Sequence, residues 1–112
     1  MEDDLVAWGR VVRLETRGRV TSRPAFATVG FVDRSDGTFA VAATSPHSHW
    51  ALNLLASPGC RATIGEETFA ATARPLVGAE HAAAVRDLIL RYGTPSEGLG
   101  SGPSFEIRRT NR

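Results

Sequence analysis

The chain has 112 residues, a formal net charge of +1, and 42% apolar and 22% charged residues, so we expect one soluble globular domain over residues 1–112. A charge this close to neutral gives no case for nucleic-acid binding. No stretch reaches the ~20 apolar residues of a membrane helix, so no membrane partner is expected. The acidic start at Met1–Asp4 is unlike a signal peptide, and a single cysteine cannot form an internal disulfide, so we expect a cytoplasmic protein.

The first half of the chain is predicted to form three strands joined by short turns. In residues 12–17, Val, Leu and Thr alternate with the charged residues Arg, Glu and Arg. This period of two marks a half-buried strand. A turn over residues 18–24 precedes a second strand at residues 25–32. Asp36-Gly37 indicates a hairpin, because this dipeptide tolerates the positive φ of tight turns. The run of mostly small and β-branched residues at 39–44 predicts a third, buried strand.

Two helices and three more strands follow. Ser45-Pro46 ends the third strand, and residues 50–55 are predicted to form a short amphipathic helix. Strands are predicted at residues 60–65, 68–77 and 105–108, and a long helix at residues 79–92, where apolar residues keep helical spacing. Short connections favour antiparallel pairing. Six antiparallel strands with two helices predict a mainly β fold, a small barrel or a highly curved sheet, and argue against a βαβ nucleotide-binding fold.

Arginine supplies all the positive charge of the side chains, because the chain contains no lysine. Five arginines lie close together near the start: Arg10, Arg13, Arg17, Arg19 and Arg23. The planar guanidinium suits a bidentate grip on phosphate or carboxylate. An anionic partner near this segment is one hypothesis, and a solvated strand face is the other.

Four aromatic and imidazole side chains are candidates for chemistry. His47 and His49 suggest a metal site, but no Asp, Glu or Cys lies near them in sequence to complete a ligand set, so we predict no metal. Trp50 allows two interpretations, a core anchor or a surface that stacks on a ring system. Tyr92 likewise could end its helix as a core contact or present its hydroxyl to a substrate.

Three motifs carry a resemblance to a known family. They are Gly18-Arg19-x-Thr21-Ser22-x-Pro24, then Val41-Ala42-Ala43, then Trp50-x-x-Asn53-Leu54-x-x-Ser57-Pro58. Together they resemble the deazaflavin-dependent nitroreductase family, within the FMN-binding split β-barrels related to pyridoxamine phosphate oxidases. The resemblance runs from about Gly9 to Arg108. It implies a split β-barrel, usually a homodimer, that binds the deazaflavin coenzyme F420.

The resemblance also implies roles for residues at matching positions. Three would hold the phosphate and glutamate tail of F420: Arg19, Thr21 and Arg23. Three would support its ring through main-chain contacts: Ala42, Ala43 and Thr44. Three would border the same pocket: Ser45, Trp50 and Asn53. Tyr92 matches one tyrosine of the family's substrate-side cluster and is the one catalytic candidate.

Two departures from the family pattern keep alternatives open. The family's lysine after Gly-Arg is Val20 here, and its basic residue after the proline is Ala25. The first hypothesis is a reductase that passes a hydride from reduced F420 to a small quinone, nitroaromatic or enone. The second is the same barrel with FMN, whose single phosphate needs no site for a long tail. The third is a barrel that binds a cofactor or other ring ligand without catalysis.

Overall fold

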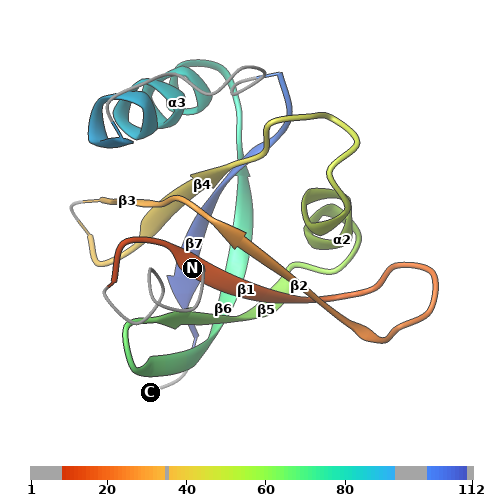
Figure 1. The fold of residues 1–112 in the computed structure, drawn as a ribbon. Coiled ribbons are helices and arrows are strands. Elements are labelled where there is room, and N and C mark those ends of the chain that lie inside the picture. The colour runs from red at the N-terminus through yellow and green to blue at the C-terminus, as the bar shows by residue number, and fades with distance from the viewer. Residues whose placement is uncertain (1–8, 35, 93–100, 111–112) are drawn as a thin grey trace.

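A computed structural model of the chain describes residues 9–34, 36–92 and 101–110, which contain seven strands and two helices (Figure 1). The strands are β1 (Val12–Arg17), β2 (Pro24–Val29), β3 (Val32–Asp33), β4 (Phe39–Ala42), β5 (Gly59–Ile64), β6 (Glu67–Leu76) and β7 (Ser104–Arg109). The helices are α2 (His49–Ala56) and α3 (Gly78–Tyr92). Neither described helix is long and apolar enough to cross a membrane.

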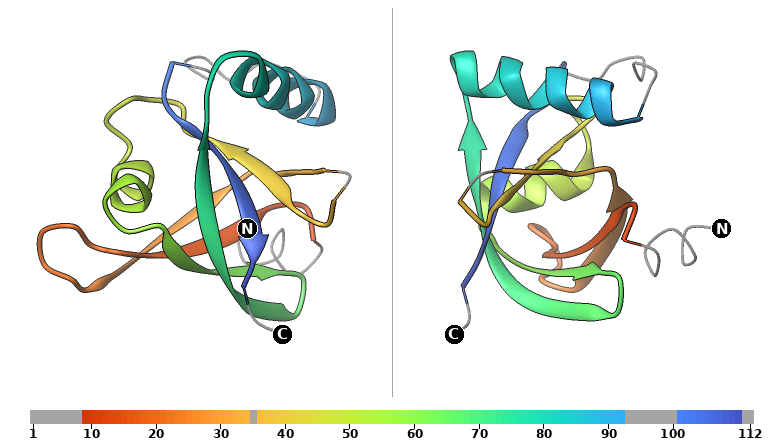
Figure 2. Two further views of the ribbon diagram at one scale, coloured as in Figure 1. Left: turned by 180° about the vertical axis from the view of Figure 1, so that it is seen from behind. Right: turned by 90° about the vertical axis from the view of Figure 1, so that its left-hand side faces the viewer.

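All strands belong to one antiparallel sheet in the order β2-β1-β5-β6-β7-β4-β3, which confirms the predicted mainly β fold. The sheet curls strongly, so that β2 and β3, its two end strands, come near each other (Figure 2). The strand count is seven instead of the predicted six, because residues 25–32 are divided between β2 and β3. The break falls at Gly30-Phe31, where the Phe31 side chain turns into the core at 4% exposure.

The main core fills the concave side of the curled sheet. Alternate residues of the central strands point into it, as the period of two in the sequence predicts. The strands contribute to it Val12, Leu14, Phe39, Val41, Phe69, Phe105 and Ile107, among others. The helix α2 contributes Ala51 and Leu54 to the same cluster and lies beside β1 and β2. This position brings the start of α2 close to the opening between the ends of the sheet.

The helix α3 packs on the opposite face of the sheet, over β3, β4 and β7. A small apolar cluster of Ala40, Leu76 and Ala84 joins them. Beside this cluster the carboxylate of Glu106, only 7% exposed, faces the guanidinium groups of Arg74 at 3.2 Å, Arg108 at 3.7 Å and Arg34 at 3.8 Å. Burial of a carboxylate is tolerated when such charged donors surround it.

The same network reaches the first turn of α3. Arg74 donates hydrogen bonds to both carboxylate oxygens of Glu80, at 3.2 and 3.3 Å. These bonds hold the pKa of Glu80 below its ordinary value of 4.5. A lowered folded-state pKa means that the contribution to stability is complete above pH 4.5 and is lost as the pH falls through the lowered pKa. The start of α3 is therefore fixed to the sheet by charge at neutral pH.

Replacing Glu106 with Gln removes the charge that faces three arginines while keeping the side-chain shape. We expect Glu106→Gln to lower the free energy of unfolding by about 1–3 kcal/mol, measured by urea denaturation at pH 7. Glu66→Gln, in the exposed β5–β6 turn, is the matched control and should change it by less than about 0.5 kcal/mol. Equal midpoints for the two variants would show that the network does not stabilise the fold.

Candidate functional site

A cavity of about 490 Å³ lies where the two ends of the curled sheet approach each other. One wall comes from Val11 and residues 27–30 at the end of β2. The opposite wall comes from Ala42 and Thr44 at the end of β4. The helices close the remaining sides with Trp50 of α2 and with Leu88 and Tyr92 of α3. Ligand sites have this size and this mixture of apolar walls with a few polar groups.

Unpaired strand edges flank this cavity on two sides. The strand β3 has only two residues, which pair with Phe39 and Ala40, so among the described strands β4 has no neighbour on that side beyond Ala40. Of the same strands, only β1 pairs with β2, which forms the other end of the sheet. An edge strand presents main-chain N–H and C=O groups that no neighbouring strand uses. The cavity therefore offers main-chain donors and acceptors to the rim of a flat ligand.

The three residues predicted to support a ring divide into two groups. Ala42 and Thr44 line the cavity, and both are at the unpaired end of β4. Ala43 does not line it, because its side chain is 1% exposed in the core and its N–H donates to the carbonyl of Pro103 at 2.9 Å. The Ser101 hydroxyl donates to the carbonyl of Thr44 at 3.3 Å. The strand end is thus held from the β7 side and open toward the cavity.

Trp50 forms the α2 wall of the cavity. Its ring packs at 5.9 Å from the ring of Phe105, with a tilt of 55°, and Phe105 is fully buried. A core contact on one side fixes the indole and leaves it half-buried at the cavity. Trp50 is therefore anchored in the core and also lines the cavity, and its stacking on a ring system stays a prediction.

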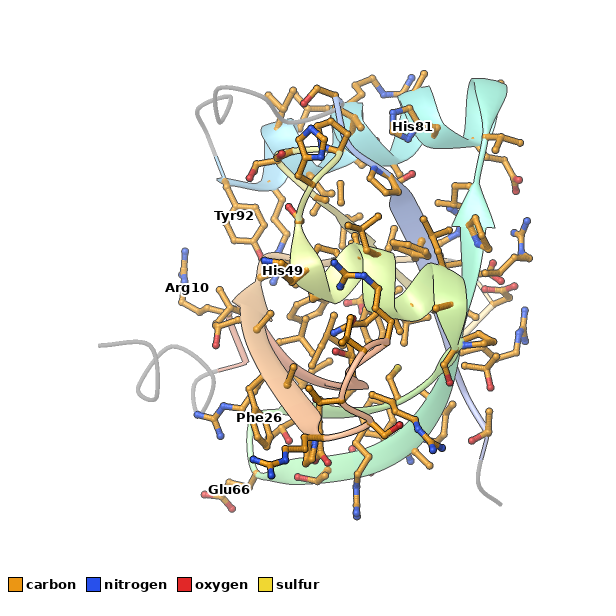
Figure 3. All side chains as sticks on the ribbon, turned by 90° about the vertical axis from the view of Figure 1, so that its right-hand side faces the viewer. Arg10, Phe26, His49, Glu66, His81 and Tyr92 are labelled. Atoms are coloured by element: carbon orange, nitrogen blue, oxygen red, sulfur yellow. The ribbon has the colours of Figure 1, made fainter. Side chains whose placement is uncertain are left out.

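Tyr92, the last residue of α3, lines the cavity beside Arg10 (Figure 3). Its hydroxyl accepts a hydrogen bond from the N–H of Phe31 at 3.0 Å and donates to the carbonyl of Arg10 at 2.7 Å. Its ring lies against Gly30, where an added Cβ would come within 2.8 Å of Cε2. Tyr92 therefore connects α3, the start of β1 and the break between β2 and β3.

Asn53 lies behind the cavity and joins three segments. It is 3% exposed, and its Nδ2 donates to the Thr16 hydroxyl at 3.1 Å. Its Oδ1 accepts from the main-chain N–H of Arg19 at 3.2 Å and from Nη1 of Arg19 at 2.8 Å. The turn between β1 and β2 is thereby fixed to α2. Asn53, predicted to border the pocket, therefore holds Arg19 in position.

Arg19 is held in one orientation by two residues of α2. Besides Asn53, its Nη1 donates to the His49 carbonyl at 3.5 Å, and its Nη2 lies 3.3 Å from His49 Nδ1. His49 Nδ1 accepts this bond in the tautomer that carries the ring proton on Nε2. Within the described part of the chain, no residue accepts a hydrogen bond from Nε of Arg19. The Nε edge is left for a bidentate contact with an anion.

The other predicted residues lie outside the cavity lining. The Thr21 hydroxyl accepts from the N–H of Arg23 at 3.3 Å in the exposed turn, and the Ser45 hydroxyl accepts from the N–H of His47 at 3.0 Å. In residues 9–34, 36–92 and 101–110, no group of three or more His, Cys, Asp or Glu could hold a metal ion. The structure thus brings Ala42, Thr44, Trp50 and Tyr92 to one cavity.

Sequence reasoning missed the part of the lining that comes from β2 and the residues near it. Val11 and Leu88 carry no signal beyond a strand and a helix pattern. Gly30 does carry one, since an isolated glycine inside a strand pattern indicates a bulge or a close approach of another group. Here that group is the ring of Tyr92.

Replacing Asn53 with Ala tests the bridge between the β1–β2 turn and α2. We expect Asn53→Ala to lower the free energy of unfolding by about 1–3 kcal/mol, because Thr16 and Arg19 lose their buried partner. Hydrogen exchange in residues 18–23 should also become faster. Leu55→Ala, half-exposed on the same helix, is the control and should leave that exchange unchanged. Unchanged exchange in the Asn53 variant would contradict the positioning role.

Comparison with known protein families agrees with the resemblance that the three sequence motifs carry. Residues 5–94 match the family described as F420H(2)-dependent quinone reductase. No curated protein sequence matches the chain significantly.

Several solved structures have the same fold. A protein described as an F420-H2 dependent reductase (FDR-A) is 20% identical with a TM-score of 0.70, over 88% of this chain and 94% of that one. A putative pyridoxamine 5'-phosphate oxidase from Listeria innocua is 15% identical with a TM-score of 0.69, over 98% and 94%. A structure described as a domain-swapped dimer is 19% identical with a TM-score of 0.69, over 95% and 92%. At these identities the likeness shows a common fold, the predicted split β-barrel.

Proposed function

This chain belongs to the F420H(2)-dependent quinone reductase family, a family of F420-dependent oxidoreductases, and we propose that it reduces a small quinone, nitroaromatic or enone with reduced F420. The observation that supports the proposal best is the cavity with two unpaired main-chain edges and an anchored tryptophan. Bound F420 supplies the hydride. The protein supplies orientation and exclusion of water.

The residues of the cavity fit a flat ring system. The main chain at Ala42 and Thr44 would hydrogen-bond to the rim of the ring, and Trp50 would lie against one face. Small side chains at this edge allow close approach of a ligand to the backbone. Leu88 and Val11 supply apolar surface that keeps water from the reacting face. Among the residues that the structure describes, no Asp, Glu, His or Arg side chain lines the cavity, which suits a reaction in which the coenzyme carries the chemistry.

Arg19 would hold the phosphate of the coenzyme. It lies next to the cavity through His49, the neighbour of Trp50, and Asn53 fixes its guanidinium. Thr21 and Arg23 of the exposed turn would add contacts with the anionic part of the ligand.

FMN is the second candidate coenzyme, supported by the composition of the turn. Val20, at 86% exposure, and Ala25 replace two basic residues of the family pattern, so Arg19 is the one cation of the turn that the structure orients. One oriented cation suits a single phosphate. Membership of a reductase family favours an enzyme over a barrel that only binds its ligand.

We also propose a homodimer in the cytoplasm. Among the described residues, five large apolar side chains are at least half exposed: Val20, Phe26, Leu55, Val77 and Leu90. Pairing of two copies would bury part of this surface. A related fold described as a domain-swapped dimer is consistent with such pairing. A lone, half-buried cysteine suits a reducing compartment.

Titration of the purified protein with F420 and with FMN, followed by fluorescence, tests the coenzyme. We expect micromolar or tighter binding of F420, about tenfold weaker in Arg19→Ala, a difference of about 1.4 kcal/mol. Arg86→Ala removes the same charge from an exposed position on α3 and is the control. Tighter binding of FMN would favour FMN, the second candidate, as the coenzyme. Binding of neither coenzyme would reject the proposed reductase function.

Tyr92→Phe tests the proposed catalytic role of Tyr92. Loss of the hydroxyl leaves the Phe31 N–H and the Arg10 carbonyl without their partner, so the free energy of unfolding should fall by about 1–2 kcal/mol. If the hydroxyl also donates a proton to the substrate, kcat should fall about 100-fold with the Kd for F420 unchanged. A loss of stability with unchanged kcat would limit Tyr92 to holding the break between β2 and β3.

A further inference from the structure

A short segment of the chain, residues 101–103, runs along residues 43–45, which follow β4 (Figure 1). It continues the antiparallel ladder in which Ser104 of β7 pairs with Ala42 of β4. The two outer residues of the segment form hydrogen bonds with residues 43 and 44, at 2.9 and 3.3 Å. The middle residue of the segment, Gly102, is buried.

Gly102 lies directly against the main chain of Ser45. A Cβ added to Gly102 would overlap the Ser45 carbonyl oxygen and lie 2.6 Å from the carbonyl carbon. It would also lie 3.0 Å from Cβ of Ala43. Gly102 is not one of the glycines with a positive φ, so the position requires glycine for space and not for its backbone conformation.

The Ser45 carbonyl that Gly102 touches also holds the start of α2. It accepts a hydrogen bond from the N–H of Ser48 at 3.2 Å, and Ser48 is the N-cap of α2. Trp50 lies two residues beyond this cap, and Thr44 lies directly before Ser45. A shift of Ser45 would therefore move both Thr44 and Trp50.

Of the two segments in contact at Gly102, the one that leads into β7 is the better anchored. Ser104 is fully buried and pairs with Ala42 on one side and with Leu76 on the other. Among the described strands, none pairs with residues 43–48 on the side away from β7. An added methyl group at position 102 would therefore displace Ser45 more than it displaces β7.

Thr44 and Trp50 form two walls of the cavity of about 490 Å³. Their separation decides whether a flat ring can contact the main chain at its rim and the indole on its face at the same time. Binding sites lose affinity or rate when their groups move by about 0.5–1 Å. The space at Gly102 is thus linked to the fit of a ring in the cavity.

We propose that Gly102 is a positioning residue for this cavity, which sets the separation of Thr44 and Trp50 and thereby the affinity for a flat ring. The proposal rests on the proposed function in taking that ring to be part of F420 or FMN. Gly102 does not line the cavity, so it acts through Ser45.

Binding of F420 and of FMN to Gly102→Ala, followed by fluorescence, tests the effect on the site. We expect the Kd of the preferred coenzyme to rise about tenfold, a difference of about 1.4 kcal/mol. Gly59→Ala is the matched control, because an added Cβ there meets no atom within 4 Å and Gly59 has no positive φ. The Kd of this control should equal that of the wild type.

A second control separates positioning from a general loss of stability. Gly102→Ala should unfold at a lower urea concentration, because overpacking forces the backbone to shift. Glu106→Gln also lowers stability, but it acts from the α3 side of the sheet, so its Kd should stay that of the wild type. If Gly102→Ala does not fold, Ser101→Ala replaces it. That variant removes the hydroxyl that donates to the Thr44 carbonyl and should raise the Kd about threefold.

Quenching of Trp50 fluorescence by acrylamide measures the same wall without any coenzyme. The chain has two tryptophans, so the variants are made in a Trp8→Phe background. We expect the quenching constant to rise about twofold in Gly102→Ala, because a displaced turn exposes the indole more often. It should stay unchanged in Gly59→Ala and in Glu106→Gln.

Two results in a protein that binds its coenzyme would overturn the positioning role. One is an unchanged Kd in Gly102→Ala, whatever the quenching shows. The other is an equal loss of affinity in Gly102→Ala and Glu106→Gln, because affinity would then follow stability.

Failure of this proposal is distinguishable from failure of the proposed function. A wild-type protein that binds neither F420 nor FMN rejects the reductase. The quenching of Trp50 then decides alone: a rise in Gly102→Ala supports the positioning of the wall, and an unchanged constant overturns it.

Discussion

The candidate site depends on one constraint, the failure of the curled sheet to close. The chain passes from one end strand of the sheet directly to the other across Gly30-Phe31, so β2 and β3 approach each other without pairing. At this break the Tyr92 hydroxyl accepts a hydrogen bond from the N–H of Phe31 and donates one to the carbonyl of Arg10. The opening is thus stabilised by a side chain from α3. Pairing of the same edges would remove the cavity.

The two helices hold this opening in different ways. The helix α3 is fixed to the outer face of the sheet by ion pairs around Glu106 and by a small apolar cluster. The helix α2 is fixed by hydrogen bonds of the buried Asn53 to Thr16 and Arg19 and by its apolar residues in the main core. Arginine is therefore neutralised by carboxylates on the α3 side. On the α2 side it is oriented by amide and imidazole groups, which leaves its charge available.

Period and motif in the sequence predict most of the fold, because they record which side of a strand or helix is buried. The alternation at residues 12–17 and the helical spacing at 79–92 correspond to β1 and α3. The break at Gly30-Phe31 escaped prediction, since the apolar run continues through it and the bend depends on the distant Tyr92. The network of Arg19 and Asn53 escaped it for the same reason, because 34 residues separate the partners.

The candidate site shows the same difference between local and distant determinants. Trp50, Ala42 and Thr44 reach the cavity because their own elements carry them there, so a motif can predict them. Their contribution comes largely from main chain and from one anchored ring, which tolerates changes in neighbouring side chains. In the proposed binding mode the anionic end depends instead on individual cations, and there Val20 and Ala25 replace basic residues of the family pattern. In that binding mode, substitution at the anionic end would alter affinity for the phosphate or tail and leave the main-chain edges at the ring in place.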